Sequence, residues 1–176
     1  MSWKFGLLAS AKNPDLQIFT NDQITVVKDM YPKAELHYLV LPKERIDTLK
    51  NLQKDHVNLL KSMHEIGLEL ASKKCQNRSI KLGYHAMPSM QQLHLHVISE
   101  DFDSVCLKTA KHWNSFTTPF FIDSLRAIKD LEATGRVMVP STSECQQLLK
   151  TKLKCHKCDE CFKNMPKLKM HIKQHL

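Results

Sequence analysis

The chain has 176 residues, of which 42% are hydrophobic, and its formal net charge is +8. This length suits one domain of ordinary size plus a small module, and the apolar share is sufficient for a buried core. The sequence contains no run of 18 apolar residues and no signal-peptide pattern, so we expect no membrane span and a cytosolic or nuclear protein.

The order of predicted elements favours an α+β domain with a mainly antiparallel sheet. Runs of β-forming residues predict strands at 16–19, 23–28, 36–41, 79–86 and 93–99. Apolar residues at helical spacing predict helices at 3–11, 47–74 and 119–133, the second of them long. We therefore expect a domain at 1–138, a polar linker at 139–152 and a finger module at 153–176.

The finger module has the spacing of a ββα-type Cys2His2 zinc finger, Cys-x2-Cys-x12-His-x3-His. The predicted Zn²⁺ ligands are Cys155, Cys158, His171 and His175. Phe162 and Leu168 fall at the two apolar positions that such a fold packs against its metal. A module of about 25 residues cannot bury enough apolar area alone, whereas structural zinc supplies about 10–16 kcal/mol. Cys161 offers a competing pair with Cys158 but shifts Phe162 out of register, so we expect a free thiol.

The finger module is also the most basic part of the chain. Residues 150–176 contain eight lysines and two acidic residues, a net charge of +6. This distribution predicts contact with a polyanion through Lys163 and Lys167. A single finger buries too little surface for tight sequence-specific binding, so we expect salt-dependent contacts with phosphates. On this view the loss of Cys158 weakens DNA binding and leaves turnover of a short, saturating substrate little changed.

Residues 92–98 place His94 and His96 two apart in an apolar run, hence on one face of a strand. Two such imidazoles can bind a metal, grip a phosphate, or supply a nucleophile. His85 ends the preceding predicted strand and Ser89 lies in the intervening turn, so both come close to His94. Three imidazoles and a hydroxyl without an acid favour a phosphoryl group over a metal, and no metal is predicted at this site.

The run Gln-Leu-His-Leu-His-Val-Ile resembles the motif of the histidine-triad (HIT) family, His-φ-His-φ-His-φ-φ with φ apolar. Gln92 replaces the first histidine. The resemblance continues in the blocks DMYPKA at 29–34, HYLVLP at 37–42, LGYHAMPSM at 82–90, DFDS at 101–104 and KHWNSF at 111–116. These blocks are similar to a branch of the family that hydrolyses 5′-adenylated DNA ends and carries a C-terminal Cys2His2 finger. We expect a short form without the N-terminal phosphopeptide-binding domain of longer members.

The resemblance implies a role for individual residues. His94 would be the nucleophile that takes AMP, His96 would stabilise the phosphate, and His85 would serve the leaving group. The implied nucleotide contacts are Ser89 with the phosphate, Asp29 with the ribose and Lys33 in the pocket. The implied DNA contacts are Trp3, Lys111, His112 and Trp113, with core packing as the alternative for both tryptophans. His37, on an apolar strand, is expected to be structural.

The resemblance thus implies a nuclear DNA-repair hydrolase that removes AMP left by abortive ligation. DNA would be its partner, nicked or double-stranded, AMP its product, and RNA–DNA junctions a further candidate substrate. One alternative is a general HIT hydrolase that acts on small adenylates or dinucleoside polyphosphates, which leaves the basic finger without a role. The other is a non-catalytic nucleic-acid-binding protein, for which the replacement at Gln92 is the first sign.

Overall fold

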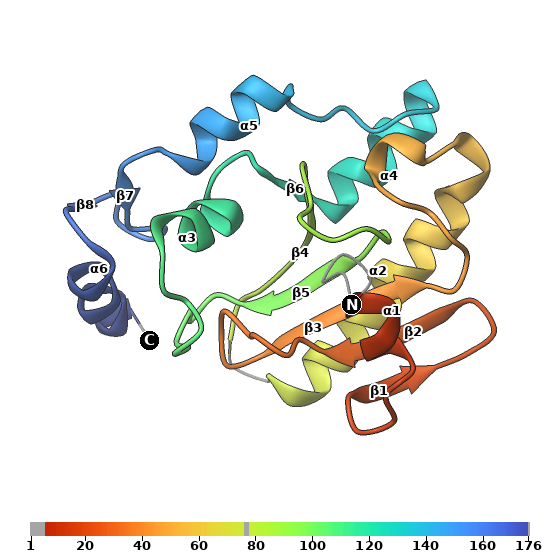
Figure 1. The fold of residues 1–176 in the computed structure, drawn as a ribbon, viewed down its shortest axis with the longest axis horizontal. Coiled ribbons are helices and arrows are strands. Elements are labelled where there is room, and N and C mark those ends of the chain that lie inside the picture. The colour runs from red at the N-terminus through yellow and green to blue at the C-terminus, as the bar shows by residue number, and fades with distance from the viewer. Residues whose placement is uncertain (1–5, 76–77, 176) are drawn as a thin grey trace.

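Six antiparallel strands form one sheet, in the order β1-β2-β3-β5-β4-β6 (Figure 1). The computed structural model describes residues 6–75 and 78–175. The strands are β1 (Gln17–Thr20), β2 (Ile24–Lys28), β3 (His37–Pro42), β4 (Ile80–His85), β5 (Leu95–Ser99) and β6 (Phe121–Asp123). The predicted α+β class with a mainly antiparallel sheet is confirmed.

Helices cover both faces of the sheet. They are α1 (Gly6–Ala11), α2 (Val57–Lys74), α3 (Ala110–Thr117), α4 (Ser124–Thr134) and α5 (Thr142–Leu149), with 3-10 turns at Leu49–Asn51 and Lys54–His56. The long α2 and its neighbour α4 pack on one face, where alternate residues of β3 and β5 such as Val40, Leu95 and Val97 form the main core. The opposite face carries the intervening histidines, flanked by α1 and α3.

A close approach at Gly67 fixes the distance between α2 and the sheet. A Cβ built at this position would lie 2.8 Å from Val97 Cγ2, so α2 contacts the back of the histidine-bearing strand β5 directly. Because interiors are close-packed, a larger residue here would push the helix off the sheet. The helix thereby supports β5 from the face opposite the histidines.

The predicted helix boundaries are wrong in two places. The 47–74 segment becomes helical only at Val57, after two 3-10 turns. The 119–133 segment begins as strand β6, and α4 starts afterwards because Asp123 Oδ1 accepts a hydrogen bond from the Arg126 N–H at 3.0 Å. The helix ends at Gly135, whose φ of 74° suits the left-handed cap.

Two helices were not predicted from the sequence. Helix α3 covers the segment just before β6, and α5 lies inside the predicted linker. A reciprocal capping box starts α5: Glu144 N–H donates to Ser141 Oγ, and Ser141 N–H donates to the Glu144 carboxylate. The segment between the two expected domains is therefore partly ordered structure, and the domain boundaries at 138 and 153 stay predictions.

The finger consists of β7 (Leu153–Lys154), β8 (Cys161–Phe162) and α6 (Met165–Ile172), followed by a 3-10 turn at Lys173–His175. It lies at one end of the molecule, while β1 and β2 lie toward the other (Figure 1). Leu168 and Ile172 of the finger share one buried cluster with Phe102 and Trp113 of the larger domain. Among the described residues, no helix is long and apolar enough to cross a membrane.

Candidate active site and metal centre

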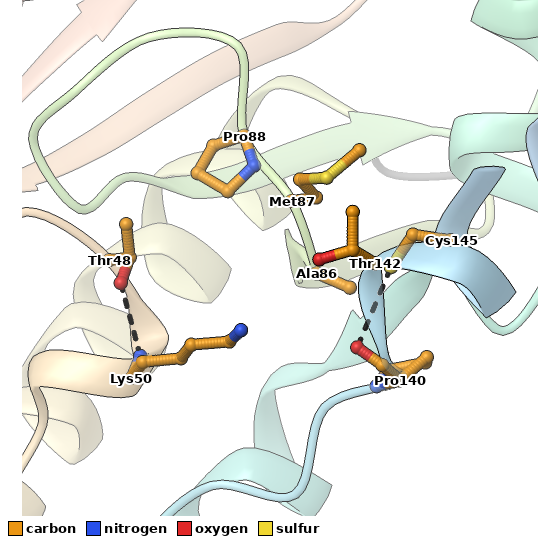
Figure 2. A pocket seen from close by; sticks show the side chains of 8 residues that line it. All are labelled: Thr48, Lys50, Ala86, Met87, Pro88, Pro140, Thr142 and Cys145. Atoms are coloured by element: carbon orange, nitrogen blue, oxygen red, sulfur yellow. Dashed lines mark hydrogen bonds between the residues drawn. The ribbon is translucent and has the colours of Figure 1, made fainter.

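Most of the predicted catalytic residues line one cavity of about 390 Å³. The predicted site residues around it are Asp29, Lys33, His85, Ser89, His94, His96, Lys111 and His112. A different hollow opens on the other side of the Met87–Pro88 turn, between Lys50 and Cys145 (Figure 2). That hollow contains none of the histidines, so the candidate active site is the larger cavity.

The histidine rings form one packed cluster. The His85 and His96 ring centroids lie 4.2 Å apart, and those of His94 and His96 lie 4.8 Å apart. Gly83 pairs with His96 across β4 and β5, which brings His85 to the end of the same ladder as His94. Three predicted imidazoles therefore converge, although the His85 ring lies against His96. Phe116 closes the back of the cluster with its edge toward His96.

A backbone carbonyl fixes the tautomer of His94. His94 Nδ1 lies 2.8 Å from the carbonyl oxygen of Gln92. A carbonyl can only accept, so the hydrogen-bond network assigns the proton to Nδ1 and leaves a lone pair on Nε2. His94 lies one residue before the start of β5 and lines the cavity. The chain thus presents the nitrogen that a nucleophilic imidazole requires.

His37, expected to be structural, sets the tautomer of His96. The Lys33 N–H donates to His37 Nδ1 at 3.1 Å, and His37 Nε2 lies 2.9 Å from His96 Nδ1. With Nδ1 accepting, His37 carries its proton on Nε2 and donates it to His96. His96 therefore carries its own proton on Nε2, a buried atom without a hydrogen-bond partner in the described part of the chain. This N–H is available to a phosphate oxygen.

Burial keeps these imidazoles neutral. Desolvation lowers the pKa of His37 to about 4, lowers that of His94, and takes those of His85 and His96 well below the ordinary value. For His94 the hydrogen bond to Gln92 acts in the opposite direction, as does the Asp29 carboxylate. A neutral imidazole is the nucleophilic form, so the cluster is prepared for attack on phosphorus at neutral pH.

Asp29, His37 and His96 also place one ligand atom each within 4.8 Å of the others, as in a metal site. The Asp29 carboxylate lies 3.4 Å from His37 Nδ1, while His37 turns its other nitrogen to His96. A histidine that turns opposite nitrogens to its two neighbours does not converge with them on one ion. The geometry favours a hydrogen-bonded relay from the Lys33 N–H through His37 to His96, in which Asp29 is a neighbour and not a member, and the prediction of no catalytic metal stays a prediction.

Gln92, the departure from the motif, supports the site from outside the cavity. Its backbone has φ of 82°, and its buried side chain donates to the carbonyls of Pro42 and Glu44 at 2.8 and 2.9 Å. These bonds hold the turn whose carbonyl orients His94. The first position of the motif is thus structural in this chain.

The residues predicted to contact DNA divide into three groups. Lys111, Lys163 and Lys167 are exposed, and His112 is half-buried beside the cavity. Trp3 lies outside the described residues. The prediction for Trp113 is wrong: it is 1% exposed, and its indole N–H donates to the Lys154 carbonyl at 2.9 Å. Trp113 lies on the buried face of α3 and anchors the finger to the domain.

The four predicted metal ligands converge in the finger. One donor atom from each of Cys155, Cys158, His171 and His175 lies within 4.8 Å of the others. His171 Nε2 lies 3.0 Å from Cys158 Sγ and 3.1 Å from His175 Nε2. Donors around a tetrahedral Zn²⁺ lie about 3.3–3.8 Å apart, so these two pairs would separate by a few tenths of an ångström around the ion, and two thiols with two imidazoles are the donor set that zinc prefers. Cys161 is exposed and outside the cluster.

Two family models together match nearly the whole chain. Residues 2–112 match the family described as scavenger mRNA decapping enzyme C-term binding. Residues 117–176 match the C2HE / C2H2 / C2HC zinc-binding finger. The first match covers β1 to β5 of the sheet and most of the histidine cavity, and the second covers β6, α4, α5 and the finger.

Similar proteins extend over the full chain. Aprataxin of Danio rerio is 47% identical over 99% of this chain and 54% of its own length, and aprataxin of Gallus gallus is 45% identical over 98% and 55%. This chain thus spans about half the length of these two relatives. An aprataxin-like protein of Saccharomyces cerevisiae is 30% identical over the whole chain and 95% of its own length.

Solved structures agree with the sequence relatives. The crystal structure of the aprataxin ortholog Hnt3 in complex with DNA has a TM-score of 0.80 at 28% identity, covering 99% of this chain and 94% of that one. Hnt3 from Schizosaccharomyces pombe has a TM-score of 0.76 at 26% identity, covering 99% and 91%. These matches span both the histidine cavity and the finger cluster. The chain therefore belongs to the aprataxin family of histidine-triad proteins.

Proposed function

We propose that this protein removes AMP from 5′-adenylated DNA ends through a covalent His94–AMP intermediate. The observation that carries the proposal is the fixed tautomer of His94, whose Nδ1–H donates to the Gln92 carbonyl. This leaves Nε2 of a neutral imidazole as the nucleophile, in a cavity lined by four further histidines. The DNA substrate is supported by the likeness to Hnt3, a relative crystallised with DNA.

In the first step His94 Nε2 attacks the phosphorus of the AMP group. The new N–P bond forms as the P–O bond to the DNA 5′-phosphate breaks, and the bonding electrons leave on the phosphate oxygen. The buried N–H of His96 would stabilise charge on a non-bridging oxygen, and Ser89 would add a hydroxyl. In the second step water attacks the same phosphorus, breaks the N–P bond and releases AMP.

The lowered pKa of His85 decides how it can serve the leaving group. Burial keeps this imidazole neutral at rest, so it offers a hydrogen-bond donor and not a stored proton. A phosphate leaving group has its second pKa at about 6, so it can depart without full protonation. In the second step the same neutral imidazole can accept the proton of the attacking water, which general-base catalysis requires.

Asp29 and Lys33 are the proposed nucleotide-binding pair. Both line the cavity, and the Asp29 carboxylate accepts a bond from the Tyr31 N–H at 2.7 Å while keeping part of its surface exposed. A carboxylate can accept bonds from ribose hydroxyls, and the Lys33 ammonium suits the phosphate. Burial lowers the pKa of Lys33, while Asp29 and Cys106 act to raise it.

The finger supplies the proposed nucleic-acid contacts outside the cavity. Its exposed Lys163 and Lys167 would neutralise backbone phosphates. Cys155, Cys158, His171 and His175 would hold Zn²⁺, which when bound supplies the folding free energy that this small module lacks. The ion takes no part in the chemical steps proposed above.

A deadenylation assay tests the proposal. AMP release is measured from a 5′-adenylated nicked duplex and from adenosine 5′-phosphoramidate, with wild type and His94→Ala. We expect the duplex to be the better substrate, and a covalent AMP adduct in wild type that His94→Ala lacks. A strong preference for the small molecule would instead support a general nucleotide hydrolase. Absence of both turnover and adduct would support a non-catalytic binding protein.

A further inference from the structure

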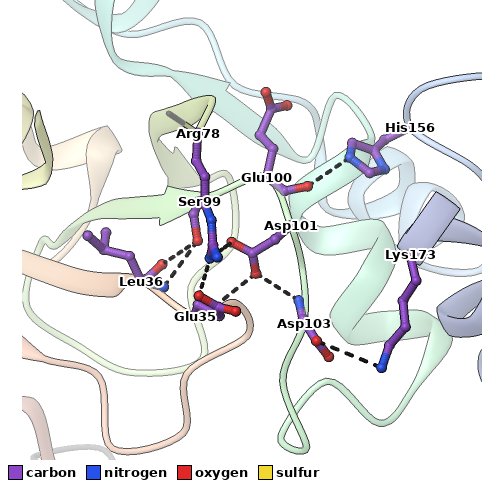
Figure 3. A network of polar contacts seen from close by, with 9 residues as sticks. All are labelled: Glu35, Leu36, Arg78, Ser99, Glu100, Asp101, Asp103, His156 and Lys173. Atoms are coloured by element: carbon purple, nitrogen blue, oxygen red, sulfur yellow. Dashed lines mark hydrogen bonds and ion pairs between the residues drawn. The ribbon is translucent and has the colours of Figure 1, made fainter. Parts of the chain in front are cut away.

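The segment that follows the catalytic strand lies between the finger and the loop proposed to bind nucleotide (Figure 3). We call residues 99–106 the bridging segment and residues 29–35 the nucleotide loop. We propose that the finger braces the nucleotide loop through the bridging segment, with Lys169 as the positioning residue. This rests on the proposed function only in that AMP is taken as the bound nucleotide.

The bridging segment holds the nucleotide loop by hydrogen bonds across a long sequence separation. Asp101, 3% exposed, accepts from the Glu35 N–H at 3.0 Å and from the Asp103 N–H at 2.8 Å. Ser104 Oγ donates to the Pro32 carbonyl at 2.5 Å. Pro32 and Glu35 are the two ends of the second half of the nucleotide loop, which includes Lys33. The bridging segment therefore holds this half at both ends.

The finger in turn contacts the bridging segment through four polar side chains, of which Lys157 lies 3.5 Å from the Glu100 carboxylate. Lys169 Nζ of α6 donates to the Ser104 carbonyl at 2.6 Å. His156 Nε2 lies 3.0 Å from the Glu100 carbonyl, so it donates there, and its ring packs against Phe102. Lys173 lies 3.9 Å from the Asp103 carboxylate in a more exposed ion pair (Figure 3). Hydrogen bonds with a charged donor are the stronger kind, which makes Lys169 the principal contact.

Ser104 joins the two sets of contacts in a single residue. Its carbonyl receives the finger lysine, and its hydroxyl holds Pro32. The next residue, Lys33, lines the cavity and donates its N–H to His37, which orients His96. A displacement of Ser104 would therefore move Lys33 and loosen the His37 relay. The finger thus contributes to nucleotide binding as well as to DNA binding, contrary to the expectation from the sequence.

An unassigned lysine just before the finger provides a matched control. Lys152 precedes β7, is exposed, and makes no side-chain hydrogen bond or ion pair with the described residues. Replacing either lysine by methionine removes one positive charge and keeps a long side chain. A difference in AMP affinity between the two variants therefore reports the contact at Ser104 and not the overall charge.

The experiment is calorimetric titration of the intact protein with AMP. We expect Lys169→Met to weaken AMP binding about three- to tenfold, the range for a partly exposed charged hydrogen bond. Lys152→Met should stay within about twofold of wild type, and Lys169→Arg, which keeps a charged donor, should recover most of the loss. Unchanged affinity in Lys169→Met, or equal losses in both methionine variants, would overturn the proposal.

A double-mutant cycle separates bracing from a general loss of structure. Ser104→Ala removes the bond to Pro32 and keeps the carbonyl that accepts Lys169. If the finger acts through Ser104, the double variant should bind AMP almost as tightly as the single variant with the lower affinity. If the affinity losses of the two single variants multiply in the double variant, the coupling is contradicted. If wild type itself bound no AMP, the proposed function would fail as well. Binding by wild type with unchanged affinity in Lys169→Met would reject the brace alone.

Discussion

The molecule contains two histidine clusters that use the same side chain in opposite ways. In the cavity, the nitrogens of His37 and His94 are paired with protein donors or acceptors, which fixes where each proton lies. In the finger, the Nε2 atoms of His171 and His175 lie 3.1 Å apart, a separation that suits two ligands of one ion. The surroundings of Nε2, and not the residue type, distinguish the two uses: His94 lines an open cavity, whereas His171 and His175 converge with two cysteine thiols.

The two clusters also differ in what keeps their imidazoles neutral. In the cavity, burial is the largest cause of the lowered pKa values of His85 and His96, and the neighbouring imidazoles and Lys33 lower them further. A metal ligand must lose its proton to bind, so the finger depends on its ion. The cavity should therefore be sensitive to pH and to single substitutions, and the finger to chelation. The following predictions test this contrast.

The largest expected effect is on chemistry. His94→Ala removes the nucleophile, and single-turnover AMP release should fall by about a thousandfold or more, since among the described residues no other imidazole that lines the cavity has its tautomer fixed by a carbonyl. His56→Ala, in a 3-10 turn outside the cavity, is the control and should leave the rate unchanged. Equal rates for His94→Ala and wild type would refute the assignment of the nucleophile.

The next effect is on stability and comes from the finger. Cys158→Ser removes a predicted ligand, and the free energy of unfolding should fall by about 3 kcal/mol or more because Leu168 and Ile172 share a core with Trp113. Urea unfolding followed by tryptophan fluorescence measures the change. Cys161→Ser, an exposed thiol outside the cluster, should behave as wild type. A stability loss in Cys161→Ser but not in Cys158→Ser would mean that Cys161, and not Cys158, is the metal ligand.

Short-range patterns predicted the parts of these clusters that the local chain determines. The finger ligands follow from spacing on one turn and one helix. His85, Ser89, His94 and His96 follow from two strands joined by one turn. The site residue that these patterns did not predict is His37. It donates a hydrogen bond to His96, 59 residues away in the sequence, because β3 pairs with β5, and the sequence does not reveal this pairing. Its apolar neighbours indicated only that it would be buried.

The error at Trp113 has a similar physical origin. The resemblance implied a DNA contact for Trp113 with core packing as the alternative, and α3 turns Trp113 and Phe116 toward the core and leaves Lys111 exposed. The surface that buries this tryptophan comes partly from the finger, whose Lys154 carbonyl accepts its N–H. A contact between two segments that lie far apart in the sequence leaves no pattern in either of them, so sequence patterns do not predict it.

The third prediction concerns pH. The pKa of His37 is about 4 in the folded protein because of burial, against about 6.5 for a solvated histidine. As pH falls from 6.5 toward 4, the unfolded chain takes up a proton that the folded chain does not. Stability should therefore fall, by up to about 1.4 kcal/mol per pH unit for each such histidine, and the loss from His37 levels off below its folded pKa.

His37→Gln tests the contribution of this residue. A glutamine amide can still donate to His96 Nδ1 but does not titrate. Urea unfolding between pH 7 and 5 should show a slope shallower by up to one proton than that of wild type. Identical slopes in the two proteins would mean that His37 is not the buried neutral group that the structure indicates.

The smallest expected effect is on DNA affinity through the exposed face of the finger. Lys163→Ala with Lys167→Ala removes two charges that make no side-chain contact with the described residues. Each lost phosphate contact should reduce the slope of log affinity against log salt by about 0.9, so the double variant should bind duplex DNA several-fold more weakly at moderate salt. Lys61→Ala with Lys73→Ala, from ion pairs with Glu132 and Glu69 at 2.6 Å each, is the charge-matched control. An unchanged slope in the finger variant would place the DNA elsewhere on the surface and leave the finger only its brace through Lys169.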